Sequence, residues 1–339
     1  MAQFLLGMTL TALEQVCTAA GMKRYVAKQI ADWLYKKRVK SISEMTNLSK
    51  ENRARLEAEY QVGHIAPAEV QTSKDGTRKY AFEAVAPGQY IETVMIPDRD
   101  RATLCVSSQA GCKMGCVFCM TGRQGFHGNL SAREIIAQFM DVEESEALTN
   151  AVFMGMGEPL DNWENVRTAI EILTAPWGFG WSPKRITLST IGDLATLKDF
   201  LDNTECHLAV SLHNPFHDER LALMPVENRY PLEQVLSLVR QYDFTGQRRV
   251  TFEYIMFAGV NDTKRHADAL ARLLKGLECR VNLIRFHKIP GSNLASGSQK
   301  LIEQFQARLE AAGVTTTIRA SRGEDIMAAC GLLAGKNKE

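Results

Sequence analysis

Three cysteines spaced as C-x3-C-x2-C constrain this chain more than any other feature of its sequence. Cys112, Cys116 and Cys119 fall in one short segment, so their thiols can converge on a single metal centre. Cysteine thiolates are the ligands of iron–sulfur clusters, and a cubane cluster has four irons to coordinate. Three local cysteines leave one iron without a protein ligand, and an open metal position is typical of catalytic sites. We therefore interpret the motif as a catalytic iron–sulfur site.

Zinc and free thiols are the two alternatives for the same cysteines. Zinc ribbons favour paired C-x2-C units, and the sequence contains no second pair of this kind. Eight cysteines in a chain of 339 residues also favour metal or redox chemistry over a disulfide scaffold.

The N-terminus and the overall composition indicate a cytoplasmic protein that does not contact a membrane. Residues 1–7 have neither a basic segment nor a small-residue cleavage site, so they do not form a signal peptide. No apolar run approaches the length of about 18 residues that a membrane span requires. The chain is long enough for one large domain of about 250 residues and a smaller one.

Residues 1–65 are predicted to form a small helical accessory domain that binds RNA. Apolar residues in the segment 26–34 follow a helical spacing, and aromatic side chains interrupt the basic ones. A solvated helix face is the simpler interpretation, but an RNA backbone is attracted to the same pattern. The basic residues of this segment are Lys23, Arg24, Lys28, Lys36, Lys37, Arg38 and Lys40.

Residues 66–100 are predicted to form a short β connector. The segment 74–77, Lys-Asp-Gly-Thr, is a turn signal, and residues 78–83 and 90–96 alternate as strands do.

Residues 101–339 are predicted to form an α/β domain, a partial (β/α)6 TIM-like barrel. Short β-rich runs alternate with helical stretches, a pattern typical of repeated βαβ units and a parallel sheet. The β-rich runs are 104–107, 151–154, 185–189, 207–212, 250–256 and 281–286, and the helical stretches include 131–144, 231–241, 264–275 and 298–311.

Unusual polar residues follow most of these strands. In βα barrels the functional residues gather at the carboxyl ends of the strands, so these positions predict one shared site. The glycines at 155 and 157 would allow close approach of the backbone, although a plain turn is an alternative. The segments concerned are the cysteine motif, 155–159, 189–190, 211–213 and His287.

In combination, these motifs resemble the radical S-adenosylmethionine (SAM) enzymes, and more narrowly the RlmN and Cfr group of adenosine C2/C8 RNA methyltransferases. The resemblance spans nearly the whole chain. It implies a [4Fe–4S] cluster on Cys112, Cys116 and Cys119, with SAM at the open iron. It also implies a monomer whose partners are 23S ribosomal RNA, transfer RNA and an electron donor such as flavodoxin or ferredoxin. The matching segments are 103–109, 153–160, 188–190, 210–213, 224–225, 259–262, 282–284 and 322–331.

The resemblance implies a reaction with two cysteines outside the cluster motif. Adenine C2 is not nucleophilic, so a first SAM methylates Cys330 and a second yields a radical that takes hydrogen from the S-methyl group. The methylene radical adds to the ring, and Cys105 then forms a disulfide with Cys330 that releases the product. Glu92 would remove the ring proton, although Cys105 could also serve. Without the resemblance, Cys105 and Cys330 would be read as buried structural thiols, and Glu92 as a solvent-facing strand residue.

The SAM-binding residues are likewise implied by the resemblance. The backbone around Glu158 would hold the methionine amino group. His287 departs from the family pattern, which has asparagine at this position, but histidine can also make a hydrogen bond. The implied residues are Gly157, Glu158, Ser189, Ser211, Leu212, His213 and His287.

Four functions are compatible with these motifs. Methylation of adenosine C2 is the leading hypothesis, and Cfr-like methylation of C8 is the near alternative because the two share all the cysteines. A radical enzyme acting on a small molecule or a protein would lack the paired Cys105 and Cys330. A cluster-binding RNA chaperone without enzymatic activity is the remaining possibility.

Overall fold

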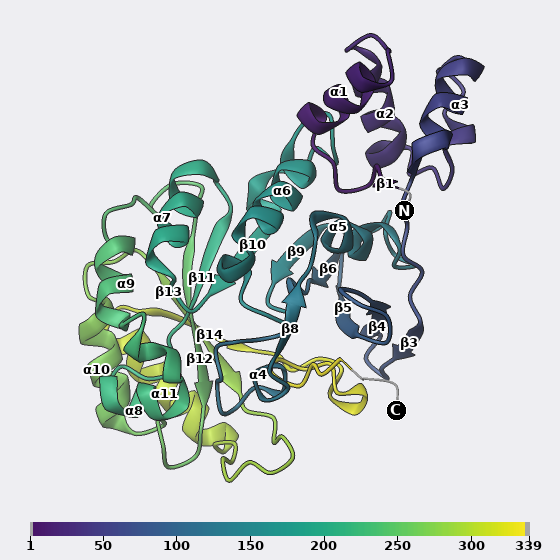
Figure 1. Ribbon diagram of the computed structural model, residues 1–339. Helices are drawn as coiled ribbons and strands as arrows, with labels where there is room; N and C mark the ends of the chain where they lie inside the picture. Colours follow the sequence, from purple (N-terminus) through teal and green to yellow (C-terminus); the bar gives the residue numbers. More distant parts are fainter. Residues whose placement is uncertain (1–2, 336–339) are drawn as a thin grey trace.

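One ten-stranded sheet runs through most of the molecule, which is a computed structural model that describes residues 3–335 (Figure 1). The strand order is β14-β13-β12-β11-β10-β9-β6-β5-β4-β3. Seven strands pair in parallel and curve into an open barrel with helices on the outside. The parallel strands are β6 (Arg101–Cys105), β9 (Asn150–Phe153), β10 (Ile186–Thr190), β11 (His207–Ser211), β12 (Val250–Met256), β13 (Arg280–Arg285) and β14 (Thr315–Arg319).

The six predicted βα units are confirmed, and β14 follows them as a seventh strand that the sequence analysis missed. Residue 315 begins a run of three threonines and an isoleucine, β-branched residues that favour a strand. Helices α5 and α11 begin where Ser131 and Ser298 accept a hydrogen bond from a backbone N–H of the first turn. The helices after the strands are α5 (Ala132–Met140), α6 (Trp163–Thr174), α7 (Leu194–Asn203), α8 (His217–Leu223), α9 (Leu232–Val239), α10 (Lys264–Leu274) and α11 (Gln299–Ala311).

The predicted β connector extends the same sheet. Strands β3 (Glu69–Thr72), β4 (Arg78–Glu83) and β5 (Tyr90–Asp98) pair in an antiparallel manner, and β5 pairs antiparallel with β6. The predicted boundary at residue 100 therefore falls in a hairpin of a continuous sheet. Because every strand pair on both sides of it is hydrogen-bonded, connector and barrel share one framework.

The N-terminal helices pack into a small unit beside the barrel (Figure 1). Strands β1 (Gln3–Phe4) and β2 (Tyr60–Gln61) pair in parallel and bring the two ends of this unit together. The predicted apolar face is buried, and part of the basic face is neutralised because Asp32 lies 3.8 Å from Lys36 and 3.6 Å from Lys37. Its helices are α1 (Leu10–Ala19), α2 (Val26–Ala31), a π-helix at Asp32–Lys36, a 3-10 turn at Ile42–Glu44 and α3 (Lys50–Glu59).

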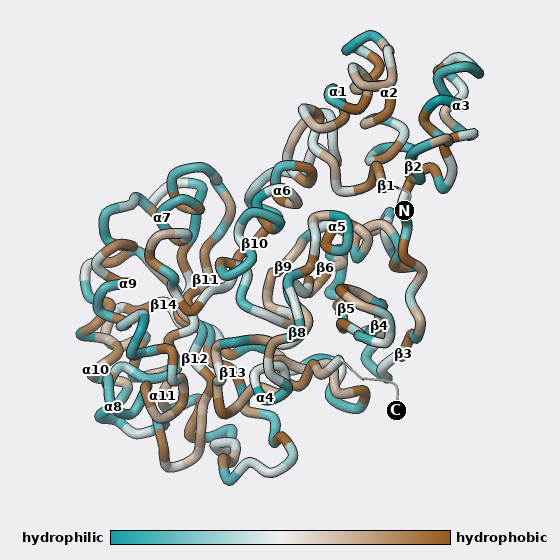
Figure 2. The backbone as a smooth tube through the Cα atoms, in the orientation of Figure 1, coloured by the Kyte–Doolittle hydropathy of each residue, from teal (hydrophilic) through white to brown (hydrophobic). Residues whose placement is uncertain are grey.

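The core lies between the sheet and the surrounding helices. Hydrophobic residues, brown in Figure 2, concentrate along the strands and on the helix faces that cover them. Within residues 3–335, no helix combines the length and the apolar character that crossing a membrane would need. The remaining elements are β7 (Gln109–Gly111), α4 (Met120–Arg123), β8 (Phe126–Asn129) and 3-10 turns at Pro159–Asn162, Pro183–Arg185, Pro225–Asn228 and Glu324–Ile326.

Candidate active site

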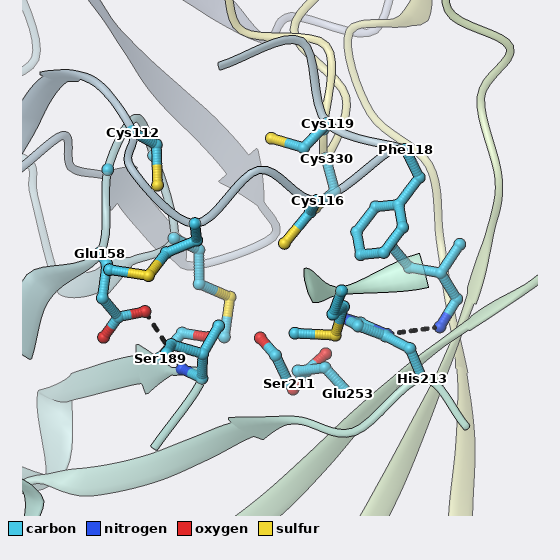
Figure 3. A pocket seen from close by; sticks show the side chains of 18 of the residues that line it. Cys112, Cys116, Phe118, Cys119, Glu158, Ser189, Ser211, His213, Glu253 and Cys330 are labelled. Atoms are coloured by element: carbon cyan, nitrogen blue, oxygen red, sulfur yellow. Dashed lines mark hydrogen bonds between the residues drawn. The ribbon is translucent and has the colours of Figure 1, made fainter. Parts of the chain in front are cut away.

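A cavity opens at the carboxyl ends of the parallel strands, where the sequence predicted a shared site (Figure 3). The cysteine loop forms one side of it, and residues of β9 to β14 form the other. Residues far apart in the sequence therefore meet around one space. The predicted site residues in its wall are Cys112, Cys116, Cys119, Gly157, Glu158, Ser189, Ser211, His213 and Cys330.

The cysteine loop lies between β7 and α4 and is shaped by glycine. Gly111 has a φ of +73°, and a Cβ at this position would lie 1.8 Å from the carbonyl oxygen of Gly125. The neighbouring Cys112 N–H donates a 2.9 Å hydrogen bond to that same oxygen. This tight, closely packed turn therefore fixes the position of Cys112, the first cysteine of the motif.

The three motif thiols are partly buried and stand apart from one another in Figure 3. Burial raises the pKa of Cys112 to about 12, so the bare thiol is protonated, whereas a coordinated thiol loses its proton. Within residues 3–335, no three Cys, His, Asp or Glu side chains converge closely enough to hold a single metal ion. A cluster presents a separate iron to each thiolate, so three thiols on one loop would fill three of the four corners of a cubane cluster.

Glycine also shapes the wall formed by the segment after β9. Gly157 has a φ of +98°, and an added Cβ would lie 2.5 Å from the Cβ of Gln109. At Gly155 an added Cβ would lie 2.6 Å from the carbonyl oxygen of Val106. Packing against residues 106–109 therefore requires both glycines, and it presents their backbone to the cavity.

Glu158 is buried, and its carboxylate binds the end of β10. It accepts hydrogen bonds from the Thr190 hydroxyl at 2.6 Å and from the backbone N–H of Ile191 at 3.1 Å. Burial raises the pKa of Glu158 to about 7. The side chain thus links the segment after β9 to the end of β10, and the residue also lines the cavity.

His213 follows β11 and is held as a neutral imidazole. Its Nδ1 accepts a 3.1 Å hydrogen bond from the Ile255 N–H, and burial, aided by the charge of Arg220, lowers its pKa to about 3. Its proton is therefore on Nε2. The ring of Phe118 meets the imidazole edge to face at 5.0 Å and so joins the cysteine loop to the strand end.

Leu212 and His287 lie differently from the other predicted cofactor-binding residues. The Leu212 side chain is fully buried in the core, and its carbonyl accepts a 2.9 Å hydrogen bond from Arg220. The His287 imidazole lies outside the cavity wall and is 3.0 Å from the Ser321 hydroxyl. The structure therefore does not bring His287 to the cavity, at the position where the sequence departs from the family pattern.

Cys330 and Cys105 come from distant parts of the chain. Cys330 lies in a turn after β14 and lines the cavity, whereas Cys105 ends β6 and is 8% exposed. Burial raises the pKa of Cys105 to about 12; the charge of Cys330 acts in the same direction and that of Arg319 in the opposite one. Cys330 and Arg319 line the same cavity, and Cys105 is buried on the strand that pairs with β9.

Glu92 is a buried residue of β5. Its Oε1 lies 3.0 Å from the Lys79 ammonium, and its Oε2 accepts a 2.7 Å hydrogen bond from the Ala334 N–H. The solvent-facing alternative is therefore wrong. The Ala334 contact joins this carboxylate to the C-terminal segment that carries Cys330.

Two charged residues of the cavity wall were missed by the sequence analysis. Glu253 of β12 is buried, which raises its pKa, and its Oε2 has no hydrogen-bond partner among the described residues. Arg319 ends β14, and its Nη1 lies 3.8 Å from that oxygen. Glu253 could have been identified from the sequence, because it is a charged residue inside the apolar run 250–256. Arg319 could not, because it lies in a strand that was not predicted.

The open barrel and the C-x3-C-x2-C loop at its strand ends define the radical SAM class of protein. Residues 106–271 match the family model of the radical SAM superfamily. Residues 4–62 match the model described as the ribosomal RNA large subunit methyltransferase N-terminal domain. A crystal structure of a radical SAM methyltransferase from Sphaerobacter thermophilus superposes with a TM-score of 0.90 and 40% identity, covering 98% of this chain and 99% of that one.

Full-length relatives narrow this class to one family. A probable dual-specificity RNA methyltransferase RlmN of Parabacteroides distasonis is 57% identical over 330 residues, covering 97% of this chain and 96% of the relative. The protein of the same name from Bacteroides fragilis is 53% identical, covering 99% and 97%. The dual-specificity RNA methyltransferase RlmN of Syntrophus aciditrophicus is 43% identical, covering 98% and 96%. The chain belongs to the RlmN family.

Proposed function

We propose that this protein is a radical SAM methyltransferase that methylates C2 of adenosine in 23S ribosomal RNA and in transfer RNA. The observation that carries the proposal is the meeting of Cys330 with the three motif cysteines around one cavity. The relatives named above are dual-specificity RNA methyltransferases of the RlmN type, which favours C2 over the Cfr-like C8 alternative.

The cavity fits the two cofactors that this chemistry needs. Cys112, Cys116 and Cys119 would hold a [4Fe–4S] cluster and leave one iron open for SAM. When bound, the cluster supplies one electron, and SAM supplies both the methyl group and the hydrogen-abstracting radical. The Oε2 of Glu253, which has no hydrogen-bond partner among the described residues, fits a ligand that donates a hydrogen bond to it in the cavity.

Neutral and backbone groups would orient SAM in this cavity. Gly157 and Glu158 line the cavity together with Cys112, and Ser189 and Ser211 present hydroxyls from neighbouring strand ends. His213 carries its proton on Nε2, so it donates one hydrogen bond without adding a charge beside a cationic ligand. Leu212 would contribute through its backbone, and His287 is the weakest member of the set because it contacts Ser321.

The remaining groups would handle the methyl group and the protons. Cys330 lines the cavity and would carry the methyl group toward the adenine, and Cys105 would form the disulfide that releases the product. Glu92 is bound by two donors, Lys79 and the Ala334 N–H, and would accept the ring proton. Movement of the Ala334 segment would free one carboxylate oxygen for that purpose.

The partners and the setting follow from the same proposal. The N-terminal unit would bind RNA, and a flavodoxin or ferredoxin would reduce the cluster of a monomeric enzyme. All eight cysteines are free thiols, which accords with the reducing cytoplasm.

Purified, cluster-loaded protein incubated with SAM, a reductant and RNA tests the proposal directly. The RNAs are a 23S ribosomal RNA fragment and transfer RNA, each prepared without modifications. Mass spectrometry of the digested RNA should show 2-methyladenosine in both. Appearance of 8-methyladenosine alone would establish the Cfr-like activity instead, and unchanged RNA would contradict the proposal.

A further inference from the structure

Lys79 and Glu92 form a buried ion pair in the antiparallel part of the sheet. In the strand register Lys79 lies opposite Val94, two residues along β5 from Glu92, so the two charged side chains lie on one face. The Lys79 ammonium lies 3.0 Å from Glu92 Oε1, and the two residues are 7% and 5% exposed. Within residues 3–335 this ammonium pairs with no other carboxylate. Because a buried charge is costly unless it is paired, each residue stabilises the charged form of the other.

Glu92 lies next to the cavity wall. The Ser107 hydroxyl donates a 2.5 Å hydrogen bond to the Glu92 carbonyl and accepts one of 2.8 Å from the Met156 N–H. The Glu92 N–H in turn donates to the Met156 sulfur at 3.2 Å. Met156 lies between Gly155 and Gly157, which both line the cavity. The backbone of Glu92 is therefore fixed to the segment after β9 that forms part of the wall.

The two carboxylate oxygens of Glu92 have partners of different kinds. Oε1 is held by Lys79, whose strand β4 is hydrogen-bonded to β3 on one side and to β5 on the other. Oε2 accepts a 2.7 Å hydrogen bond from the Ala334 N–H, which belongs to the irregular segment that follows Cys330. If this segment moves, Oε2 loses its donor while Oε1 keeps its cation. The ammonium also favours the ionised carboxylate, which is the form that can accept a proton.

We propose that Lys79 is a positioning residue that holds Glu92 by Oε1 as a carboxylate and leaves Oε2 to take the proton from adenine C2. This inference rests on the proposed function of Glu92. In the step concerned the C2–H bond of the covalent RNA adduct breaks, its electron pair stays in the ring, and the proton forms a bond to Oε2. Lys79 keeps its own protons throughout and acts only through Glu92.

RNA that carries deuterium at adenine C2 tests this inference. Full-length, cluster-loaded protein receives SAM, a reductant and a 23S ribosomal RNA fragment with either hydrogen or deuterium at that carbon. Lys79→Met loses the charge but keeps a long side chain, and it should form 2-methyladenosine about tenfold more slowly, a part of what a general base contributes. Its rate should be lower with deuterium than with hydrogen, because breaking the bond at C2 has become slow.

Two further measurements locate the effect in proton removal. Methylation of Cys330 needs no base at C2, so Lys79→Met should acquire the S-methyl group at the wild-type rate. Lys79→Arg keeps a cation and should recover most of the rate of RNA methylation. A Lys79→Met protein whose slower rate is the same with hydrogen and deuterium is impaired in another step and would overturn the inference. A Lys79→Met protein as fast as wild type would overturn it as well.

Arg78→Met is the matched control. Arg78 precedes Lys79 on β4, points to the other face and lies 3.0 Å from Glu144, so its substitution also removes an ion pair from this strand. Its rate of RNA methylation and its dependence on the isotope should be those of wild type. An equal loss in Arg78→Met and Lys79→Met would show a general loosening of β4 and would contradict the inference. If Lys79→Met fails to fold, Lys79→Gln, which keeps a donor for Oε1 without the charge, takes its place with the same outcomes.

Glu92→Gln separates this inference from the proposed function. An amide is too weak a base to take the proton, so this variant should form no 2-methyladenosine and still methylate Cys330. Turnover at the wild-type rate in Glu92→Gln would defeat the role of Glu92 as the base, and the inference with it. Loss of turnover in Glu92→Gln together with wild-type rates in Lys79→Met would defeat the inference alone.

Discussion

Cys330 lines the cavity but lies outside the cluster motif, so its substitution separates metal binding from methyl transfer. We expect Cys330→Ala to keep about four irons per chain, since the three motif thiols remain, and to lose RNA methylation entirely. Peptide mass spectrometry should find one added methyl group on Cys330 in wild type. A wild-type protein without that methyl group would contradict the role given to this cysteine.

Cys105 differs from Cys330 because it is buried beside the cavity and would act last. We expect Cys105→Ala to methylate Cys330 and begin the radical step, and then to stall with RNA attached through Cys330, since no thiolate is left to form the releasing disulfide. A gel shift that survives denaturation and disappears with nuclease would detect the adduct. Normal turnover by this variant would show that another group releases the product. Cys206→Ala is a suitable control, because that buried thiol lies in the core at the start of β11.

At the level of single residues, sequence reasoning located thiols better than charges. Cysteines are scarce, and their spacing or family position identifies them even without structure. Arg319 and Glu253 were missed because their importance comes from β12 and β14 meeting at one cavity, which no local pattern displays. Glu92 was assigned a role from resemblance, but its burial and its contact with Lys79 became visible only in the fold.

At the level of elements, the cysteine loop depends on one glycine. Gly111→Ala would place a Cβ 1.8 Å from the Gly125 carbonyl at a φ of +73°, so the turn before Cys112 must move. We expect iron and sulfide content to fall by more than half, measured after anaerobic reconstitution, while circular dichroism stays that of a folded protein.

Gly125 provides the matched control for this loop. It has a φ of +76°, but a Cβ there would meet nothing within 4 Å, so Gly125→Ala adds backbone strain of about 1 kcal/mol without a collision. Gly125→Ala should therefore retain its iron. Equal iron loss in both variants would show that positive φ alone, and not the collision, controls the loop.

The barrel could be predicted as a repeat of βα units because each strand and helix has its own hydrophobic period. The seventh strand was missed because β14 is rich in threonine, and its outer position leaves alternate residues exposed. The predicted connector differs for another reason. Local patterns identify strands 78–83 and 90–96 but do not show that β5 pairs with the first barrel strand, since pairing is a property of the whole sheet.

At the level of the whole molecule, His64 joins the N-terminal unit to the barrel. Its Nδ1 contacts the Asp141 carboxylate, and its Nε2 lies 3.0 Å from the Val39 carbonyl. Both partners are acceptors, so both ring nitrogens must donate and the imidazole must be protonated. The hydrogen bond to Asp141 accordingly raises the pKa of His64, against the effects of burial and of the nearby Lys40. Other charged groups around this joint are Arg38, Glu44, Glu143 and Glu146.

The contact between His64 and Asp141 should make the free energy of unfolding depend on pH, with a larger contribution at low pH than at high pH. Because the pKa of His64 is raised in the folded state, protonated His64 stabilises the fold. This stabilisation is fully present below the unfolded-state pKa of about 6.5 and is lost as the pH rises through the folded-state pKa. We expect His64→Gln to cost about 1.5–3 kcal/mol at pH 6, the size of a hydrogen bond to a charged group, and less at pH 9. Urea unfolding at both values measures this, with the exposed His127→Gln as the control. A cost that is equal at the two pH values would show that His64 acts as a neutral spacer and that its charge does not hold the two units together.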